Sequence, residues 1–348
     1  GDLLVARIAR TGPISLADYM ADCLMHPEHG YYATRDPFGQ SGDFITAPEI
    51  SQMFGELIGL SLAQSWIDQG SPDAITVAEL GPGRGTLMAD VLRATKAVPG
   101  FNGALTVHFI EASPVLRKSQ ATAVPDAIWH DGVDTLPDQP LFLIANEFFD
   151  ALPIRQFVRE GDGWREKMVG VTDQALSFGL SSAAPLGLLE HRLADTGEGD
   201  LVEHCTALPA IMQAIGTKID AHGGAALVID YGDWQSQGDT LQALKAHDHV
   251  DPLSTPGAND LTAHVDFAAI AHNAAPAKFT RLTTQGVFLE RLGITARAQT
   301  LAKSLTGTAR QAHVLAHRRL THPAEMGDLF KVMGIYPATA TPPAGLEP

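Results

Sequence analysis

Short apolar runs alternate with longer amphipathic segments over most of the chain. The runs that have the length of strands are 75–80, 105–110, 127–129, 141–145 and 225–230. The run at 141–145 is apolar at every position, which is typical of a parallel strand buried on both faces. Because strands separated by helix-length segments favour an α/β fold, the sequence predicts a Rossmann-like, doubly wound, mostly parallel sheet.

Two regions interrupt this alternation. Residues 1–72 include a short helix that begins at a capping pattern formed by Ser15 and Asp18, and then a long polar and aromatic loop. Residues 154–221 contain short alternating runs, which predict an inserted antiparallel β meander followed by a helix. We therefore expect an N-terminal helical region with a cofactor or substrate loop over 1–72, a core over 73–153 and 222–340, and a substrate-docking subdomain over 154–221.

A glycine-rich turn follows the first predicted core strand. Glu79 ends the apolar run, and Gly81, Gly83 and Gly85 follow at alternate positions before a predicted helix. Glycines let backbone N–H groups approach a ligand closely, and the helix start adds a positive dipole end. The dinucleotide fingerprint requires a glycine where this chain has Thr86, so NAD is a poor match. Taken alone, the turn could also be a tight connection without a ligand.

Polar residues at the next two strand ends narrow the choice of ligand. Glu111 follows the second strand, where a carboxylate can accept hydrogen bonds from both ribose hydroxyls of an adenosine. The glycine turn with Glu79 ahead of it resembles the first motif of class I S-adenosylmethionine (SAM) methyltransferases. Asp131 follows the third strand, where that class often places a polar contact to the adenine. Together the three strand ends predict a SAM site formed by Glu79, Gly81, Gly83, Gly85, Glu111 and Asp131, and we add Asn146 at the end of the fourth strand.

The fourth strand ends in residues suited to the acceptor of the methyl group. Asn146 and Glu147 precede two phenylalanines and Asp150, in the place of the fourth-strand motif of SAM-dependent N-methyltransferases. This chain has Glu-Phe-Phe where two prolines and an aromatic residue are common. Methyl transfer needs a lone pair aimed at the methyl carbon, and carboxylates can orient a guanidinium through paired hydrogen bonds. We expect Asn146, Glu147 and Asp150 to act on the acceptor, although Asp150 alone could be a capping or turn residue.

The loop before the core leads into another helix. Thr46 and Glu49 form a second capping pattern, and the apolar spacing predicts one helix from there to about Asp68. Asp43 stands just before this helix start. We interpret its segment as a lid over the cofactor, with simple packing as the alternative.

Composition and charge limit the partners. The formal net charge of −16 disfavours nucleic acid, which is bound by clustered Lys and Arg. The two cysteines form no CxxC pair, so we expect neither a disulfide framework nor a metal site, and a reducing compartment. No apolar run has the roughly 18 to 20 residues of a membrane helix, and no signal-like start is visible. We expect a soluble, cytoplasmic protein; the chain starts at Gly1, which leaves a removed leader open.

Several longer segments carry a family resemblance. GYYATRDPFGQSGDFITAPEIS, VAELGPGRGTL, NEFFDALPIRQF, ALVIDYG and DLTAHVDF together resemble the MidA family, SAM-dependent methyltransferase relatives of the mitochondrial complex I assembly factor. The resemblance implies protein arginine N-methylation, with a subunit of respiratory complex I as the acceptor in mitochondrial members. No mitochondrial presequence is obvious, so the chain looks like a bacterial, cytoplasmic member, whereas eukaryotic relatives belong in the mitochondrial matrix. A non-catalytic assembly chaperone, a small-molecule methyltransferase and a homodimer stay open.

Overall fold

The computed structural model describes residues 2–34, 46–245 and 248–348, so the predicted site residue Asp43 lies outside the described residues. The chain divides into two compact units. The first unit takes its residues from 1–37, 150–208 and 235–264, and the second from 38–149, 209–234 and 265–348. Among the described helices, none has both the length and the apolar character needed to cross a membrane.

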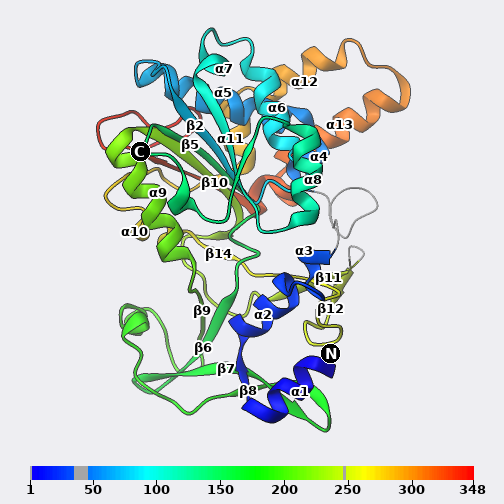
Figure 1. Cartoon of the computed structure of the whole chain (residues 1–348), viewed down its shortest axis with the longest axis vertical. Coiled ribbons are helices and arrows are strands. Elements are labelled where there is room, and N and C mark those ends of the chain that lie inside the picture. Colours follow the sequence, from blue (N-terminus) through cyan, green and yellow to red (C-terminus); the bar gives the residue numbers. More distant parts are fainter. Residues whose placement is uncertain (1, 35–45, 246–247) are drawn as a thin grey trace. The chain divides into compact units, whose positions relative to one another are not determined.

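The second unit is built on a nine-stranded, mostly parallel sheet (Figure 1). Its order is β15-β17-β10-β5-β2-β3-β4, with β14 beside β10 and β16 beside β17. Neighbours from β10 to β4 pair in parallel, whereas β17 is antiparallel to β10. The expected α/β fold with a mostly parallel sheet is therefore confirmed. The strands are β2 (Ile75–Leu80), β3 (Leu105–Ile110), β4 (Ile128–His130), β5 (Leu141–Asn146), β10 (Gly224–Asp233), β14 (Val265–Asp266), β15 (Lys278–Phe279), β16 (Thr283–Thr284) and β17 (Phe330–Tyr336).

Helices surround this sheet. Every residue of the central strands β2 and β5 is buried, as expected for strands covered on both faces. On one face, Phe54, Met88 and Phe288 from three helices join Val77 and Phe142 in one apolar core. The helices are α4 (Ala47–Ile50), α5 (Gln52–Asp68), α6 (Thr86–Thr95), α7 (Phe101–Ala104), α8 (Pro114–Ala123), η1 (Val133–Thr135), α9 (Leu208–His222), α10 (Phe267–Asn273), α11 (Gln285–Arg291), α12 (Ile294–Ala302), α13 (Gly307–Thr321) and η3 (Pro323–Gly327).

The predicted single helix from Thr46 to about Asp68 is wrong in one respect. It is two helices, α4 and α5, separated by Ser51, whose backbone is extended at φ −160° and ψ 135°. The Ser51 hydroxyl accepts a hydrogen bond from Met53 N at 3.3 Å, so this serine caps the second helix, while Thr46 makes no side-chain cap. Side-chain capping inside a helical pattern favours such a break. The break leaves α4 as a short separate segment in contact with α5 and α6.

The first unit is mainly antiparallel. Its five-stranded sheet has the order β1-β7-β6-β9, with β8 paired to β7. Phe157, Trp164, Leu189 and Val202 form its own small core. Ser15 accepts a hydrogen bond from Asp18 N at 3.0 Å, which confirms the predicted helix start. The elements are α1 (Asp2–Thr11), β1 (Ile14–Ser15), α2 (Leu16–Met25), α3 (Tyr31–Thr34), β6 (Ile154–Glu160), β7 (Gly163–Thr172), β8 (Ala175–Leu180), η2 (Gly187–Leu193), β9 (Leu201–Cys205), β11 (Gln242–Lys245), β12 (Asp248–Val250) and β13 (Asp260–Thr262).

Candidate functional site

The strand register brings three of the predicted polar residues to one edge of the large sheet. Glu79 in β2 lies opposite Phe109 in β3 and Ile144 in β5. Glu111 and Asn146 follow those two residues by two positions. Side chains alternate between the two faces of a sheet. Glu79, Glu111 and Asn146 are therefore on the same face as the core side chains of Phe109 and Ile144. The carboxyl ends of β2, β3 and β5 therefore present Glu79, Glu111 and Asn146 on one face.

The glycine turn between β2 and α6 needs glycine for two reasons. Gly81 and Gly85 have φ values of +58° and +82°, which residues with a side chain rarely adopt. A Cβ on Gly81 would also lie 3.0 Å from the ring of Phe148, and one on Gly85 would lie 3.2 Å from Cβ of Ala123. The turn therefore runs close to its neighbours and leads directly into the amino end of α6.

Glu79 is a buried carboxylate with an unmet hydrogen-bonding capacity. Glu79 is only 3% exposed, and its Oε2 has no hydrogen-bond partner in the described part of the chain. Burial raises the pKa of Glu79 to about 8, and the N–H of Met88 offsets only part of that rise. A buried carboxylate without a partner is costly, so this position suits a cationic ligand group.

Glu111 is buried and held by two donors. Its Oε1 accepts from Ser113 N at 2.7 Å, and its Oε2 accepts from Gln120 Nε2 at 3.0 Å. Burial raises the pKa of Glu111, and these hydrogen bonds oppose the rise. The carboxylate is thus fixed in direction while each oxygen keeps capacity for a further donor.

Gln120 contacts two of the predicted site residues, and sequence reasoning missed it. It is fully buried in α8, and its Nε2 also donates to the carbonyl of Gly83 at 2.8 Å. Its Oε1 accepts from the indole Nε1 of Trp129 at 2.8 Å. One amide therefore joins the glycine turn, Glu111 and β4. The sequence offered no signal for it, because a glutamine within an amphipathic helix is usually solvated.

Asn146 ends β5, and Glu147 follows it directly. Asn146 Nδ2 donates to Glu147 Oε1 at 3.2 Å, and the N–H of Ala47 at the start of α4 donates to the same oxygen at 3.1 Å. Glu147 has φ +50°, an unfavourable value for a residue with a side chain. Asp230 at the end of β10 supports the turn, since its Oδ2 accepts from Phe148 N and Phe149 N at 3.2 and 3.0 Å.

A pocket is lined by the glycine turn together with Asn146 and Glu147. Thr86 Oγ1, at the start of α6, donates to Glu49 Oε1 of α4 at 2.6 Å, so α4 forms one wall. Three carboxylates, from Glu49, Glu79 and Glu147, line it. The lining residues are Thr46, Pro48, Glu49, Glu79, Gly81, Pro82, Gly83, Arg84, Thr86, Leu87, Asn146 and Glu147.

Asp131 and Asp150, also predicted as site residues, are not among the residues that line this pocket. Asp131 follows β4, its side chain is 93% exposed, and it pairs with Arg117 Nη2 at 2.6 Å. Arg117 Nε also donates to the backbone oxygen of Glu111 at 2.8 Å. Asp150 is buried and belongs to the first unit, where its carbonyl accepts from Ala263 N at 3.0 Å. Among the described residues, no three His, Cys, Asp or Glu side chains are grouped to hold a metal ion.

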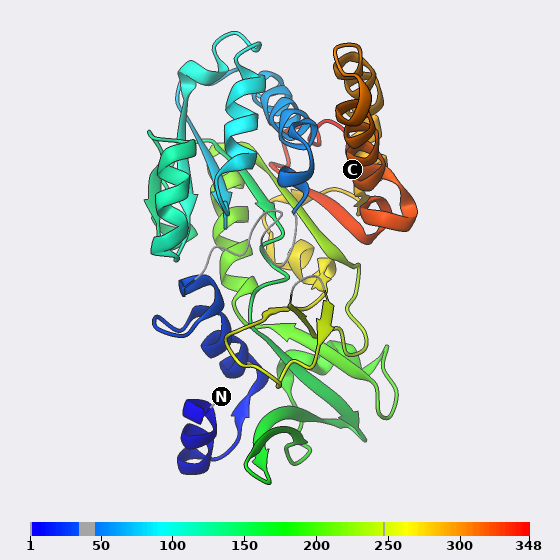
Figure 2. The same ribbon diagram turned by 90° about the vertical axis from the view of Figure 1, so that its right-hand side faces the viewer.

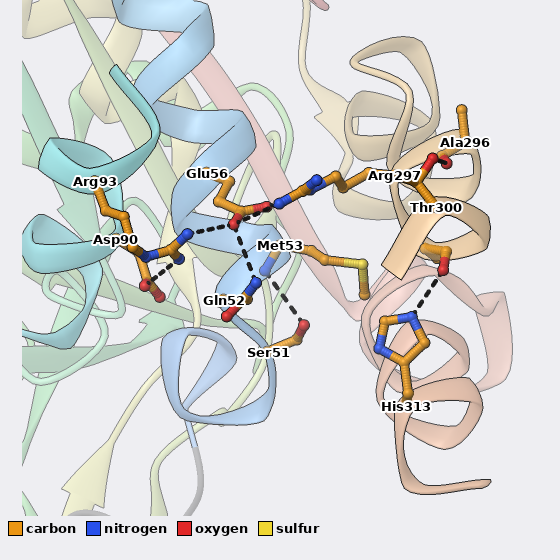
Figure 3. Close-up of polar contacts among 11 residues, drawn as sticks. Ser51, Gln52, Met53, Glu56, Asp90, Arg93, Ala296, Arg297, Thr300 and His313 are labelled. Atoms are coloured by element: carbon orange, nitrogen blue, oxygen red, sulfur yellow. Dashed lines mark hydrogen bonds and ion pairs between the residues drawn. The ribbon is translucent and has the colours of Figure 1, made fainter. Parts of the chain in front are cut away.

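An ion-pair cluster centred on the buried Glu56 joins α5, α6 and α12 (Figure 3). Glu56 of α5 accepts from Arg93 Nη1 of α6 at 2.6 Å and from Arg297 Nε of α12 at 2.7 Å. Burial alone raises the pKa of Glu56, but the hydrogen bonds from Arg297 and Arg93 outweigh it, so the pKa lies below the usual value. The cluster fixes α5 and α6 to each other, and the first residues of α6 line the pocket.

Comparisons with known proteins agree with this geometry. Residues 57–285 match the model of a family described as "Putative S-adenosyl-L-methionine-dependent methyltransferase". The mitochondrial protein arginine methyltransferase NDUFAF7 of Xenopus laevis is 35% identical over 365 residues, covering 96% of this chain and 83% of the relative. That of Homo sapiens is 35% identical over 368 residues, covering 96% and 82%. A crystal structure from Burkholderia thailandensis, bound to S-adenosyl-homocysteine, is 29% identical with a TM-score of 0.81, covering 98% of this chain and 92% of that one.

Proposed function

Since the chain belongs to the MidA-like family of SAM-dependent methyltransferases, we propose that it uses SAM to methylate an arginine side chain of a protein. The activity class and the cofactor follow from membership of the family. The arginine acceptor comes from the relatives named protein arginine methyltransferase, which align with 96% of the chain. The observation in the structure that supports the proposal most directly is the carboxylate-lined pocket between the glycine turn and Asn146 and Glu147.

The residues present fit the cofactor. SAM carries a positive charge on sulfur and an ammonium group, and the buried, partnerless Oε2 of Glu79 suits a cation. Glu111, held by Ser113 and Gln120, suits the two ribose hydroxyls. The glycine-rich backbone from Gly81 to Gly85 and the start of α6 suit the remaining polar groups of SAM. When bound, SAM supplies a methyl group activated by the positive sulfur.

Asn146 and Glu147 would orient the acceptor. A carboxylate can hold a guanidinium through charge-assisted hydrogen bonds and so limit the directions in which its nitrogen points. The bonds from Ala47 N and Asn146 Nδ2 to Oε1 fix the carboxylate of Glu147, as this positioning role requires. Asp150 as a further acceptor residue, and Asp131 and Asp43 as cofactor contacts, stay part of the proposal.

We also propose a subunit of the respiratory complex I type as the acceptor, on the strength of the family resemblance alone. The antiparallel sheet of the first unit is our candidate for docking that protein. A cytoplasmic location and a homodimer stay predictions.

The test uses labelled SAM. A lysate is incubated with the labelled cofactor and either the wild type, Glu147→Gln or the matched exposed control Glu190→Gln. We expect a labelled protein band whose modified residue is an arginine by mass spectrometry, with the label greatly reduced only for Glu147→Gln. Label confined to small molecules, or no label while SAM binds by calorimetry, would contradict the proposed acceptor.

A further inference from the structure

The helical hairpin formed by α12 and α13, residues 294–321, differs in charge from the rest of the chain. Figure 1 and Figure 2 both show it in orange, extending away from the large sheet of the second unit. It contains no Asp or Glu, whereas the whole chain has 40 acidic and 24 basic residues. Its basic residues are Arg297, Lys303, Arg310, Arg318 and Arg319. We call residues 294–321 the basic hairpin.

Only one side of α13 is attached to the protein. Leu320 is fully buried, His313 Nε2 lies 3.0 Å from the carbonyl of Ala298, and His317 Nε2 lies 3.0 Å from Thr295 Oγ1. Leu320 is the buried residue of this 15-residue helix. Helical periodicity places His313, His317 and Leu320 on one stripe, so the opposite face of α13 is left to solvent.

The solvent face combines cations with apolar side chains. Val314 and Leu315 are 56% and 59% exposed, although both are large and apolar. Arg310 and Arg319 are exposed, each one helical turn from one of these apolar residues, and in the described part of the chain no ion pair is formed by either. Arg318 differs, because its Nε pairs with Glu325 at 2.9 Å. An apolar pair flanked by unpaired guanidinium groups is the composition of a binding surface, in which arginine is enriched.

We propose that the outer face of the basic hairpin binds an acidic, partly apolar segment of another protein. Arg310 and Arg319 would pair with its carboxylates, and Val314 and Leu315 would contact its apolar side chains. This inference goes beyond the proposed methyl transfer and does not depend on it.

Charge decides between this occupant and two others. Both an anionic bilayer and a second copy of this chain would meet the whole molecule with its net charge of −16, and would be repelled. A short acidic segment reaches the hairpin alone, within the roughly 8 to 10 Å over which charges act at ordinary salt. The apolar part of the face is also confined to Val314 and Leu315, whereas a helix that inserts into a bilayer needs a continuous apolar face.

The test measures binding directly. A fluorescein-labelled peptide of repeating Glu-Glu-Leu is titrated with the whole protein and followed by anisotropy, with a Gln-Gln-Leu peptide as the neutral probe. The Arg310→Glu/Arg319→Glu variant is compared with the matched control Lys96→Glu/Lys278→Glu, which reverses two exposed charges elsewhere in the second unit. We expect the acidic peptide to bind and the neutral peptide not to bind. Binding of the acidic peptide should weaken at high salt. It should be about tenfold weaker for Arg310→Glu/Arg319→Glu and unchanged for the control variant.

Other outcomes overturn the proposal. These are no binding of the acidic peptide to the wild type, or equal loss in the control variant. Binding to phosphatidylglycerol vesicles that needs Arg310 and Arg319 and outcompetes the peptide would assign the surface to a membrane. A wild-type dimer in sedimentation that dissociates in the hairpin variant would assign it to a second copy. Circular dichroism melts check that both variants are folded.

Discussion

Gln120 Nε2 donates a hydrogen bond to Glu111 Oε2 at 3.0 Å, and this contact sets the direction of the carboxylate proposed to bind the ribose. The same nitrogen holds the carbonyl of Gly83 at 2.8 Å. Glu111 and the glycine turn thus share one buried donor group. Neither can shift without changing the environment of the other.

Replacing Gln120 with Met should weaken cofactor binding more than it harms the fold. The change keeps the side-chain volume but removes the donor to Glu111, and hydrogen bonds to charged groups contribute about 1.5–3 kcal/mol. We expect the Kd for S-adenosyl-homocysteine by calorimetry to rise about 10- to 100-fold. Gln139→Met, which removes a hydrogen bond to Thr76 away from the site, is the control. An unchanged Kd in Gln120→Met would contradict the positioning role.

The carboxylate of Glu79 should make stability depend on pH. Its pKa is raised by burial to about 8, against 4.5 normally, so between these values the folded protein holds a proton that the unfolded chain has lost. The unfolding free energy therefore falls as pH rises from about 4.5 to 8, by at most about 1.4 kcal/mol per pH unit from this group. Urea denaturation across this range should show a smaller fall in Glu79→Gln than in the wild type. Parallel pH profiles would refute the assignment.

His108 should act in the opposite direction at lower pH. Burial, followed by the charge of His130, lowers its pKa to about 4, and its Nδ1 lies 2.8 Å from His130 Nε2. Because the folded pKa lies below the unfolded value of 6.5, protonation favours unfolding, and stability is lost as pH falls from about 6.5 to 4. We expect His108→Leu to flatten this part of the denaturation profile. The exposed His249→Leu should leave it unchanged.

The Glu56 cluster should show coupling between α5 and α12. Removing one partner of a buried ion pair can cost about 3–5 kcal/mol, but both arginines are more than a third exposed, so solvent screening reduces the cost. We expect Arg297→Met to lower the unfolding free energy by about 1–2 kcal/mol and Glu56→Gln by more. In a double-mutant cycle the two losses should not add. Additive losses would mean that the contact contributes little.

The sheet of the second unit could be predicted because its strands are continuous apolar runs. Residues 105–110 were expected as a strand and form β3 with the same bounds, and 141–145 lie within β5. Burial on both faces requires apolar residues at every position, and that signal is local. The break at Ser51 was missed because its cause is a single hydroxyl bonded to Met53 N.

The sequence was enough to pick out several candidate site residues but not the hydrogen bonds that link them. Glu79, Glu111 and Asn146 stand at strand ends, which the pattern reveals, and parallel pairing brings strand ends together. Gln120 could not be found, because its three partners are 9 or 37 positions away in the chain and none shares a periodic pattern with it. The support of Phe148 and Phe149 by Asp230 spans about 80 positions and was equally invisible.

The left-handed backbone of Glu147, at φ +50°, has a consequence for attempts to make this protein more heat-resistant. Selection for heat resistance alone would favour glycine or asparagine there, since these residues adopt such a backbone at lower cost. The same exchange would delete the carboxylate proposed to hold the acceptor. Screens for thermotolerant variants should therefore also measure the methylation rate of any variant at this position. We expect its melting temperature to rise and its catalytic rate to fall.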